Sequence, residues 1–289
     1  MTTSEVSEVS EALRSGWITT GPRTKAFERQ LSNYCHTGTT VCLNSATACM
    51  ELALRVLGVG PGDEVITSAY TYTATASVTC HVGAKVVLVD TAPDSYEMDY
   101  DKLCAAITER TKVVMPVDLG GVVCDYDRIY AAVESRKRLF RPANEIQKAF
   151  GRVIVLADAA HAFGVERVNE DGSSDSAATF GDAAMFSFHA TKVFNTIEGG
   201  CVCFKDEDLY PLLNQWKNFG ITGPEDVEYV GGNAKMNEFC AAMGVCNLRH
   251  LDAEIGKRKA VAERYWDNLE GTAGVTVFRP ANNIRHNYA

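Results

Sequence analysis

Lys192 is the residue whose surroundings best predict nucleophilic chemistry. It follows the stretch Ser187-Phe188-His189-Ala190-Thr191, which begins where one apolar run ends, and Glu198-Gly199-Gly200 leads into the next apolar run. A solvated lysine has a pKa of about 10.4 and is a poor nucleophile at neutral pH. Burial and nearby positive charge lower that pKa, which Schiff-base formation requires. This position therefore suits an amine that attacks a carbonyl better than it suits a solvated surface charge.

Asp158 and His161 follow another apolar run, Val153–Ala157. In open α/β sheets, ligands bind at the edge formed by the carboxyl ends of the strands. Taken alone, the pair is explained more simply as a helix-capping Asp with a His in the next turn.

Two further polar turns also follow predicted strands. Asn44-Ser45-Ala46-Thr47 precedes a predicted helix, and its small residues would let backbone N–H groups approach a phosphate. Thr67–Thr75 contains Tyr70 and Tyr72, and either ring could lie on a flat ligand. Each turn also has an ordinary explanation, because Ser and Thr cap helices and Tyr packs at sheet edges.

Together, the four segments meet the needs of a single cofactor. They supply an amine for an aldehyde, a carboxylate for a pyridine nitrogen, a phosphate site and a stacking ring. Those are the requirements of pyridoxal 5'-phosphate. The combination predicts that Lys192 holds this cofactor as a Schiff base.

The elements that must position these residues alternate between strands and helices. Short β-branched runs alternate with helical patterns, which is typical of βα units and a mainly parallel sheet covered by helices. The predicted strands are Thr40–Leu43, Glu64–Thr67, Lys85–Val89, Lys112–Val117, Val153–Ala157, Ala183–Phe186 and Gly200–Phe204. The predicted helices include Glu8–Arg14, Ala48–Leu57 and Tyr126–Val133, while Arg136–Arg152 and Asn169–Thr179 are interpreted as surface excursions.

The pattern changes after about Asp206. Long helices are predicted over Glu238–Leu251 and Ala253–Leu269, followed by a strand over Val275–Phe278. We therefore expect a large domain over residues 1–220. Residues 221–289 are expected to form bridging helices and the start of a smaller domain, with a further strand beginning near Asn287.

Composition excludes several classes of function. The chain has 289 residues and a formal charge of −9, with no basic run, so nucleic-acid binding is not expected. No apolar run reaches the roughly 20 residues that span a bilayer, so we expect no membrane segment. The ten cysteines are scattered, which favours buried, reduced thiols in a cytoplasmic protein over a zinc site, and we expect no metal.

The sequence resembles the DegT/DnrJ/EryC1/StrS family of sugar aminotransferases, which are fold type I pyridoxal-phosphate enzymes. The most specific matches are Asp158-Ala159-Ala160-His161-Ala162-Phe163-Gly164 and Phe186-Ser187-Phe188-His189-Ala190-Thr191-Lys192, with the trailing Glu198-Gly199-Gly200. The resemblance implies an aspartate-aminotransferase-like fold with a mainly parallel seven-stranded sheet flanked by helices. It also implies an incomplete small C-terminal α/β domain.

The resemblance also implies roles for individual residues. Lys192 would carry the Schiff base and shuttle the proton, Asp158 would pair with the pyridinium nitrogen, and His161 would lie near the phenolic oxygen. The remaining cofactor contacts would come from Ala160 under the ring, Tyr72 above it, Ala46, Thr47 and Ser187 at the phosphate, and Asn233 from a second subunit. A homodimer with shared active sites follows. Two departures from the family pattern, Ala234-Lys235 after Asn233 and Asp118 in place of a common histidine, concern the inter-subunit contact and substrate recognition.

The implied reaction transfers an amino group, with glutamate as the expected donor, to a keto group of a nucleotide-linked sugar. Lys192 argues against the dehydratases of the family, which have His at this position. Fold alone leaves other pyridoxal-phosphate chemistry open, such as an aldolase, a desulfurase or an aromatic amino-acid synthase, and also a non-catalytic homologue.

Overall fold

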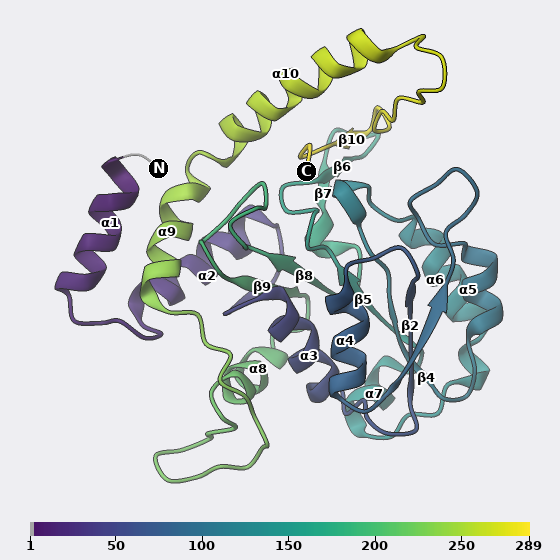
Figure 1. Ribbon diagram of the computed structural model, residues 1–289. Helices are drawn as coiled ribbons and strands as arrows, with labels where there is room; N and C mark the ends of the chain where they lie inside the picture. The colour runs from purple at the N-terminus through teal and green to yellow at the C-terminus, as the bar shows by residue number, and fades with distance from the viewer. Residues whose placement is uncertain (1–2) are drawn as a thin grey trace.

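The computed structural model describes residues 3–289 and centres on one seven-stranded sheet (Figure 1). The strand order is β1-β9-β8-β5-β4-β2-β3. Only β9 runs antiparallel to its neighbours, and the remaining pairings are parallel, so the predicted mainly parallel sheet is confirmed. The strands are β1 (Thr39–Leu43), β2 (Glu64–Ser68), β3 (Lys85–Val89), β4 (Thr111–Met115), β5 (Ile154–Asp158), β8 (Ala183–Ser187) and β9 (Gly200–Phe204).

Helices cover both faces of this sheet. Successive strand residues point to opposite faces, so that Val155 packs in one hydrophobic cluster while Ile154 and Leu156 pack in the other. One cluster includes residues of α2 (Pro22–Tyr34), α5 (Tyr100–Ala106), α6 (Tyr126–Ser135) and α9 (Glu238–Leu248). The other includes residues of α3 (Ala46–Val56), α4 (Thr73–His81), α7 (Glu145–Phe150) and α8 (Leu209–Lys217). Burial on both faces explains why the strands appear in the sequence as nearly continuous apolar runs.

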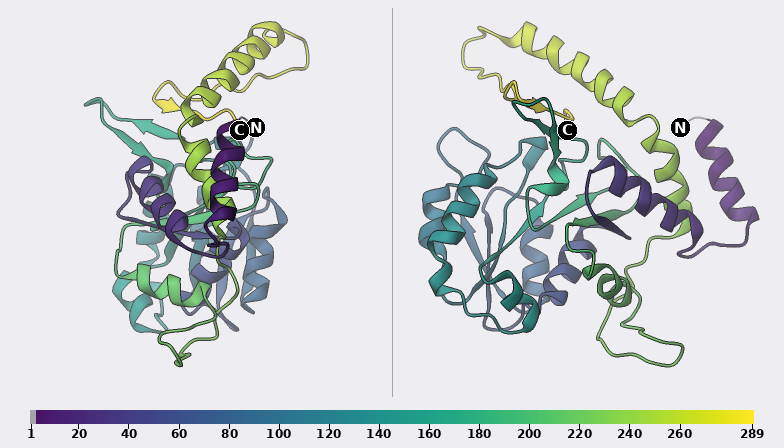
Figure 2. Two further views of the ribbon diagram at one scale, coloured as in Figure 1. Left: turned by 90° about the vertical axis from the view of Figure 1, so that its left-hand side faces the viewer. Right: turned by 180° about the vertical axis from the view of Figure 1, so that it is seen from behind.

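The C-terminal part departs from this layered body. Helix α10 (Leu251–Leu269) extends from the body as a long arm, and the chain returns from its far end towards the sheet (Figure 1, Figure 2). There, β10 (Ile284–Arg285) pairs with β6 (Glu166–Val168), which also pairs with β7 (Ser174–Ser176). At the other end of the chain, α1 (Thr3–Arg14) lies beside α9.

Most predicted elements agree with the structure to within a few residues, with three corrections. Val275–Phe278 is not a strand, because it is largely exposed and has no pairing partner, and the short strand of this region is β10 instead. Arg136–Arg152 is not only a surface excursion, because it contains α7 and the 3-10 helix Lys137–Leu139 and buries Gln147. Asn169–Thr179 likewise contains β7 and the 3-10 helix Ala177–Thr179, whose alanines are buried.

The structure gives one finding each on the cysteines, on metal-ligand groups and on membrane-spanning helices. All ten cysteines are free thiols, most of them buried. Among residues 3–289, no group of three or more His, Cys, Asp or Glu side chains is arranged to hold a metal ion. Over the same residues, no helix has the length and apolar character needed to cross a bilayer.

Candidate active site

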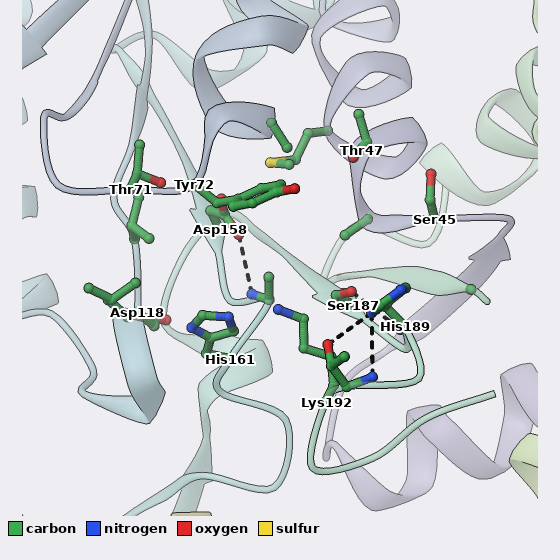
Figure 3. Close-up of a pocket in the computed structure, with 18 of the residues that line it drawn as sticks. Ser45, Thr47, Thr71, Tyr72, Asp118, Asp158, His161, Ser187, His189 and Lys192 are labelled. Atoms are coloured by element: carbon green, nitrogen blue, oxygen red, sulfur yellow. Dashed lines mark hydrogen bonds between the residues drawn. The ribbon is translucent and has the colours of Figure 1, made fainter. Parts of the chain in front are cut away.

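A pocket of about 330 Å³ lies where the parallel strands end. Asp158 is the last residue of β5 and Ser187 the last of β8, while Lys192 lies in the loop from β8 to β9. Figure 3 shows their side chains gathered around one space below the ring of Tyr72. The pocket is lined by all but one of the residues named from the sequence: Ala46, Thr47, Tyr72, Asp158, Ala160, His161, Ser187 and Lys192.

Lys192 is held in a short turn, in which its backbone N–H donates to the carbonyl of His189 at 2.9 Å. Its amine points into the pocket beside His161 (Figure 3). Burial lowers the pKa of Lys192, and the negative charge of Asp158 opposes that shift. A larger fraction of neutral amine results, as attack on an aldehyde requires.

Asp158 is buried, with 5% of its surface exposed, and both carboxylate oxygens have partners. The hydroxyl of Thr75 donates to Oδ2 at 2.7 Å, and the backbone N–H of Ala160 donates to Oδ1 at 3.2 Å. Burial raises the pKa of Asp158, while these two bonds and the charge of Lys192 lower it. A buried carboxylate of this kind is a strong partner for a ring N–H, because little water competes for it.

His161 is held by a backbone group. The N–H of Gly120, in the 3-10 turn Leu119–Gly121 after β4, donates to its Nδ1 at 3.1 Å. Because Nδ1 accepts this bond, the neutral ring carries its proton on Nε2. Burial lowers the pKa of His161, and the charge of Lys192 lowers it further. The site therefore holds a neutral imidazole with a known donor atom.

The N-terminus of α3 forms the anion site. Ser45 caps the helix by accepting a bond from the N–H of Ala48 at 3.1 Å, so the first helical residues, Ala46 and Thr47, keep N–H groups without helical partners. Gly200 permits this arrangement, because a Cβ there would lie 2.5 Å from the nitrogen of Ala46. With the Ser187 hydroxyl in the same pocket, these groups fit a phosphate.

The choice of Tyr72 over Tyr70 agrees with the positions of the two rings. Tyr72 lines the pocket and its ring lies across it (Figure 3). Tyr70 stacks on Tyr96 instead, with ring centroids 6.2 Å apart, and lines an adjoining cavity. Tyr72 is 75% exposed, so one face of its ring is free to cover a flat ligand.

Asn233 is the one named residue that does not line the pocket. It is exposed on the segment before α9, its carbonyl accepts from the side chain of Asn44 at 3.2 Å, and its Oδ1 accepts from Lys235 at 3.2 Å. This position is compatible with the expected reach into a second subunit, and the role of Asn233 stays a prediction.

Four hydrogen bonds of the site were not foreseen from the sequence. Thr75 donates to Asp158, and Gly120 donates to His161. Asp118 is fully buried at the pocket wall, where it accepts bonds from the backbone of Cys124 and the hydroxyl of Tyr126, both at 3.0 Å. Thr75 lies within the stretch Thr67–Thr75 noted in the sequence. A donor on the backbone, such as the N–H of Gly120, has no sequence signature, and neither do the bonds that Asp118 accepts from residues six and eight positions further along.

The comparisons with known proteins agree with this geometry. The model of the DegT/DnrJ/EryC1/StrS aminotransferase family matches residues 1–289. The spore coat polysaccharide biosynthesis protein SpsC of Bacillus subtilis is 36% identical over 283 residues, which cover 94% of this chain and 68% of that protein. The UDP-4-amino-4-deoxy-L-arabinose–oxoglutarate aminotransferase of Shewanella sediminis is 32% identical, over 98% of this chain and 71% of that protein.

A solved structure extends the likeness to the whole described fold. Spr1654 of Streptococcus pneumoniae, in its PMP form, is 42% identical with a TM-score of 0.95, and the match covers 100% of this chain and 74% of that one. A PLP form of the same protein matches equally well. The chain therefore belongs to the DegT/DnrJ/EryC1/StrS family of pyridoxal-phosphate-dependent sugar aminotransferases.

Proposed function

We propose that this chain binds pyridoxal phosphate on Lys192 and uses it to move an amino group from glutamate to a keto group of a nucleotide-linked sugar. The observation that carries the proposal is the convergence of Lys192, Asp158 and the N-terminus of α3 on one pocket. Each meets a different need of the same cofactor, and all three lie at the carboxyl ends of the parallel strands.

The chemistry of the lining residues fits this cofactor at both ends. The N–H groups of Ala46 and Thr47, with the hydroxyls of Thr47 and Ser187, would hold its phosphate. Asp158 would pair with the ring nitrogen at the opposite end. The bound cofactor supplies an electron sink that stabilises negative charge on the carbon bearing the amino group.

The protein contributes position and proton movement. Lys192 is the one pocket side chain that combines an amine with a lowered pKa, so it can accept a proton and return it to a neighbouring carbon. His161, neutral and protonated on Nε2, would donate a hydrogen bond to the phenolic oxygen. Ala160 would pack beneath the ring and Tyr72 above it, which excludes water from the reacting carbon.

The substrate class rests on relatives. The Shewanella protein carries both a nucleotide sugar and oxoglutarate in its name. Oxoglutarate is glutamate after the loss of its amino group, so glutamate is the donor we infer for this chain.

We further infer a homodimer with shared active sites. Each chain would contain a large domain over residues 1–220 and a smaller domain that begins at residue 221. The segment between α8 and α9 extends from the body (Figure 1) and carries exposed apolar side chains, including Val230, which is 87% exposed. Exposed apolar residues grouped in this way favour contact with another surface. Asn233 lies on the same segment, as a residue that reaches into a partner's pocket would.

The amino-transfer half-reaction tests the proposal directly. Protein loaded with pyridoxal phosphate should show visible Schiff-base absorption, lose it on addition of glutamate, and release one equivalent of oxoglutarate. Lys192→Ala should abolish both signals. Lys257→Ala, on the exposed side of α10, should leave them unchanged because Lys257 pairs with Glu254 at the surface, away from the pocket.

The alternatives give different results. An aldolase or a synthase on the same fold would show the absorption without stoichiometric oxoglutarate. A non-catalytic homologue without cofactor would show no absorption. Either result would overturn the proposed reaction.

A further inference from the structure

The C-terminal segment, residues 284–289, returns from the far end of α10 to the body of the fold (Figure 2). Asn287 of this segment is 1% exposed and lines the cavity that adjoins the cofactor pocket. That cavity also contains His161 and Lys192. A segment that is more than 120 residues away in sequence is thus built into the surroundings of His161.

We propose that Asn287 is a positioning residue that fixes the orientation of His161, by locking the loop after β5 against the Leu119–Gly121 turn. The inference rests on the proposed function only in so far as His161 serves the cofactor. The geometry itself concerns the chain's own residues.

Asn287 holds the loop after β5 through hydrogen bonds of its side-chain amide. Its Nδ2 donates to the carbonyl of His161 at 2.7 Å and to the carbonyl of Phe163 at 3.0 Å. Its Oδ1 accepts from the N–H of Ala289 at 3.2 Å. A buried amide with both of its donors engaged on one loop holds the backbone that carries the imidazole, and removing it would leave two carbonyls without these donors.

The Leu119–Gly121 turn contacts both His161 and the C-terminal segment. Gly120 donates its N–H to Nδ1 of His161. Gly121 has a φ of +79°, and a Cβ there would lie 2.4 Å from Oδ1 of Asn287 and 2.9 Å from Nε2 of His286. The turn therefore packs directly on the C-terminal segment. His161 receives its backbone support from Asn287 and its ring contact from a turn that Asn287 also touches.

The charged and titratable groups around His161 come from several elements. Lys192 faces it from the loop after β8, Asp158 from the end of β5 and Asp118 from the loop after β4, with His286 behind the turn. Burial, and then the charge of Lys192, lower the pKa of His161. A hydrogen bond donated to Nδ1 stabilises the neutral ring, so losing that bond would move the pKa up, towards its ordinary value.

Arg258 of α10 adds a second tie to the segment, donating to the carbonyl of Tyr288 at 3.2 Å. The arm and the returning segment are thereby joined next to the site. On this proposal, the imidazole of His161 keeps one orientation only while residues 284–289 stay packed in place. The start of the second domain is thereby connected to the chemistry of the first.

Nitrogen NMR of His161 in the cofactor-free 289-residue protein tests the proposal without relying on activity. The parent protein should show a single neutral tautomer, protonated on Nε2. Asn287→Ala should lose this preference and show a mixture of tautomers with an upward shift of the pKa. Asn282→Ala, an exposed asparagine of the same region, should reproduce the parent spectrum.

Asn287→Ala could instead loosen the whole segment 284–289. A second variant therefore leaves Asn287 in place and changes the turn that packs against it. Gly121→Ala places a Cβ against Asn287 and should also lose the single tautomer. If both variants keep the parent tautomer and pKa, Asn287 does not position His161. A failed glutamate half-reaction would leave this measurement unaffected, so the two ideas fail independently.

Discussion

At the scale of single residues, the charge of Asp158 depends on Thr75, which does not itself line the pocket. Asp158 must stay ionised although it is buried, and burial alone favours its protonated form. Thr75 opposes this by donating to Oδ2, and its hydroxyl also lies 2.7 Å from that of Thr71. The charge that the proposed ring contact needs is thus maintained partly by a hydroxyl of α4.

Removing that hydroxyl should weaken the site while preserving its shape. In Thr75→Val, Asp158 loses a charge-assisted bond of about 1.5–3 kcal/mol, which corresponds to a fall of roughly tenfold to hundredfold in the glutamate half-reaction. Thr79→Val, one turn further along α4 and equally buried, is the control. Rapid-mixing absorbance would measure the rate, and equal rates in both variants would show that Thr75 has no part in maintaining the charge.

Asp118 should make the stability of the cofactor-free protein depend on pH. Burial raises the pKa of Asp118 to about 7, with the charge of Asp158 adding to the shift and the bonds from Cys124 and Tyr126 opposing it. Between the unfolded pKa of about 3.9 and pH 7, the folded state binds more protons, so stability falls as pH rises through this window.

Asp118→Asn removes that titration. The parent protein should lose up to about 4 kcal/mol of unfolding free energy, relative to the variant, between pH 4 and pH 7, and little more above that. Urea unfolding at a series of pH values would measure the difference. Parallel curves for the two proteins would mean that Asp118 titrates normally.

At the scale of elements, the sequence predicted what was encoded locally. The strand from Ile154 to Asp158 was recognisable because both of its faces are buried, and Asp158 became a candidate because it lies at the carboxyl end of this central strand. Helix α7 was missed because it has only six residues, two of them charged, and its one buried residue, Gln147, is held by a bond to the carbonyl of Leu57. The contact between Asn287 and His161 joins residues far apart in the chain, and no local pattern records it.

The close approach of α3 and β9 gives an element-scale prediction. Gly200→Ala would place a Cβ 2.5 Å from the nitrogen of Ala46 and 2.7 Å from the carbonyl of Phe186, both backbone atoms that cannot rotate away. The helix N-terminus must shift, so we expect about 1–3 kcal/mol of lost stability and clearly weaker binding of pyridoxal phosphate.

Gly256→Ala in α10 is the matched control, because nothing lies within 4 Å of its added Cβ. It should leave cofactor affinity unchanged. Thermal unfolding and a fluorescence titration with pyridoxal phosphate would separate the two effects. Unchanged affinity in Gly200→Ala would remove the N-terminus of α3 from the phosphate site.

At the scale of the whole molecule, a single chain leaves several exposed apolar side chains without a packing partner to explain them. The segment between α8 and α9 exposes Phe219, Val227 and Val230, and Asn233 follows on the same segment. Tyr72 at the pocket mouth is also largely exposed. A second copy that covers both regions would account for them, and would bring one copy's Asn233 towards the other's phosphate site.

A complementation experiment tests this sharing of sites. Lys192→Ala and Asn233→Ala should each be nearly inactive alone, because each homodimer would lack one required group at both sites. In a two-fold dimer, mixing after subunit exchange creates heterodimers in which one site lacks both groups and the other is intact, so about a quarter of the parent activity should return. Mixing Lys192→Ala with Asp158→Asn is the control: both groups come from the same chain, so each site of the heterodimer stays defective and no activity should return. If the first mixture is also inactive while light scattering shows that dimers form, Asn233 does not act across the interface.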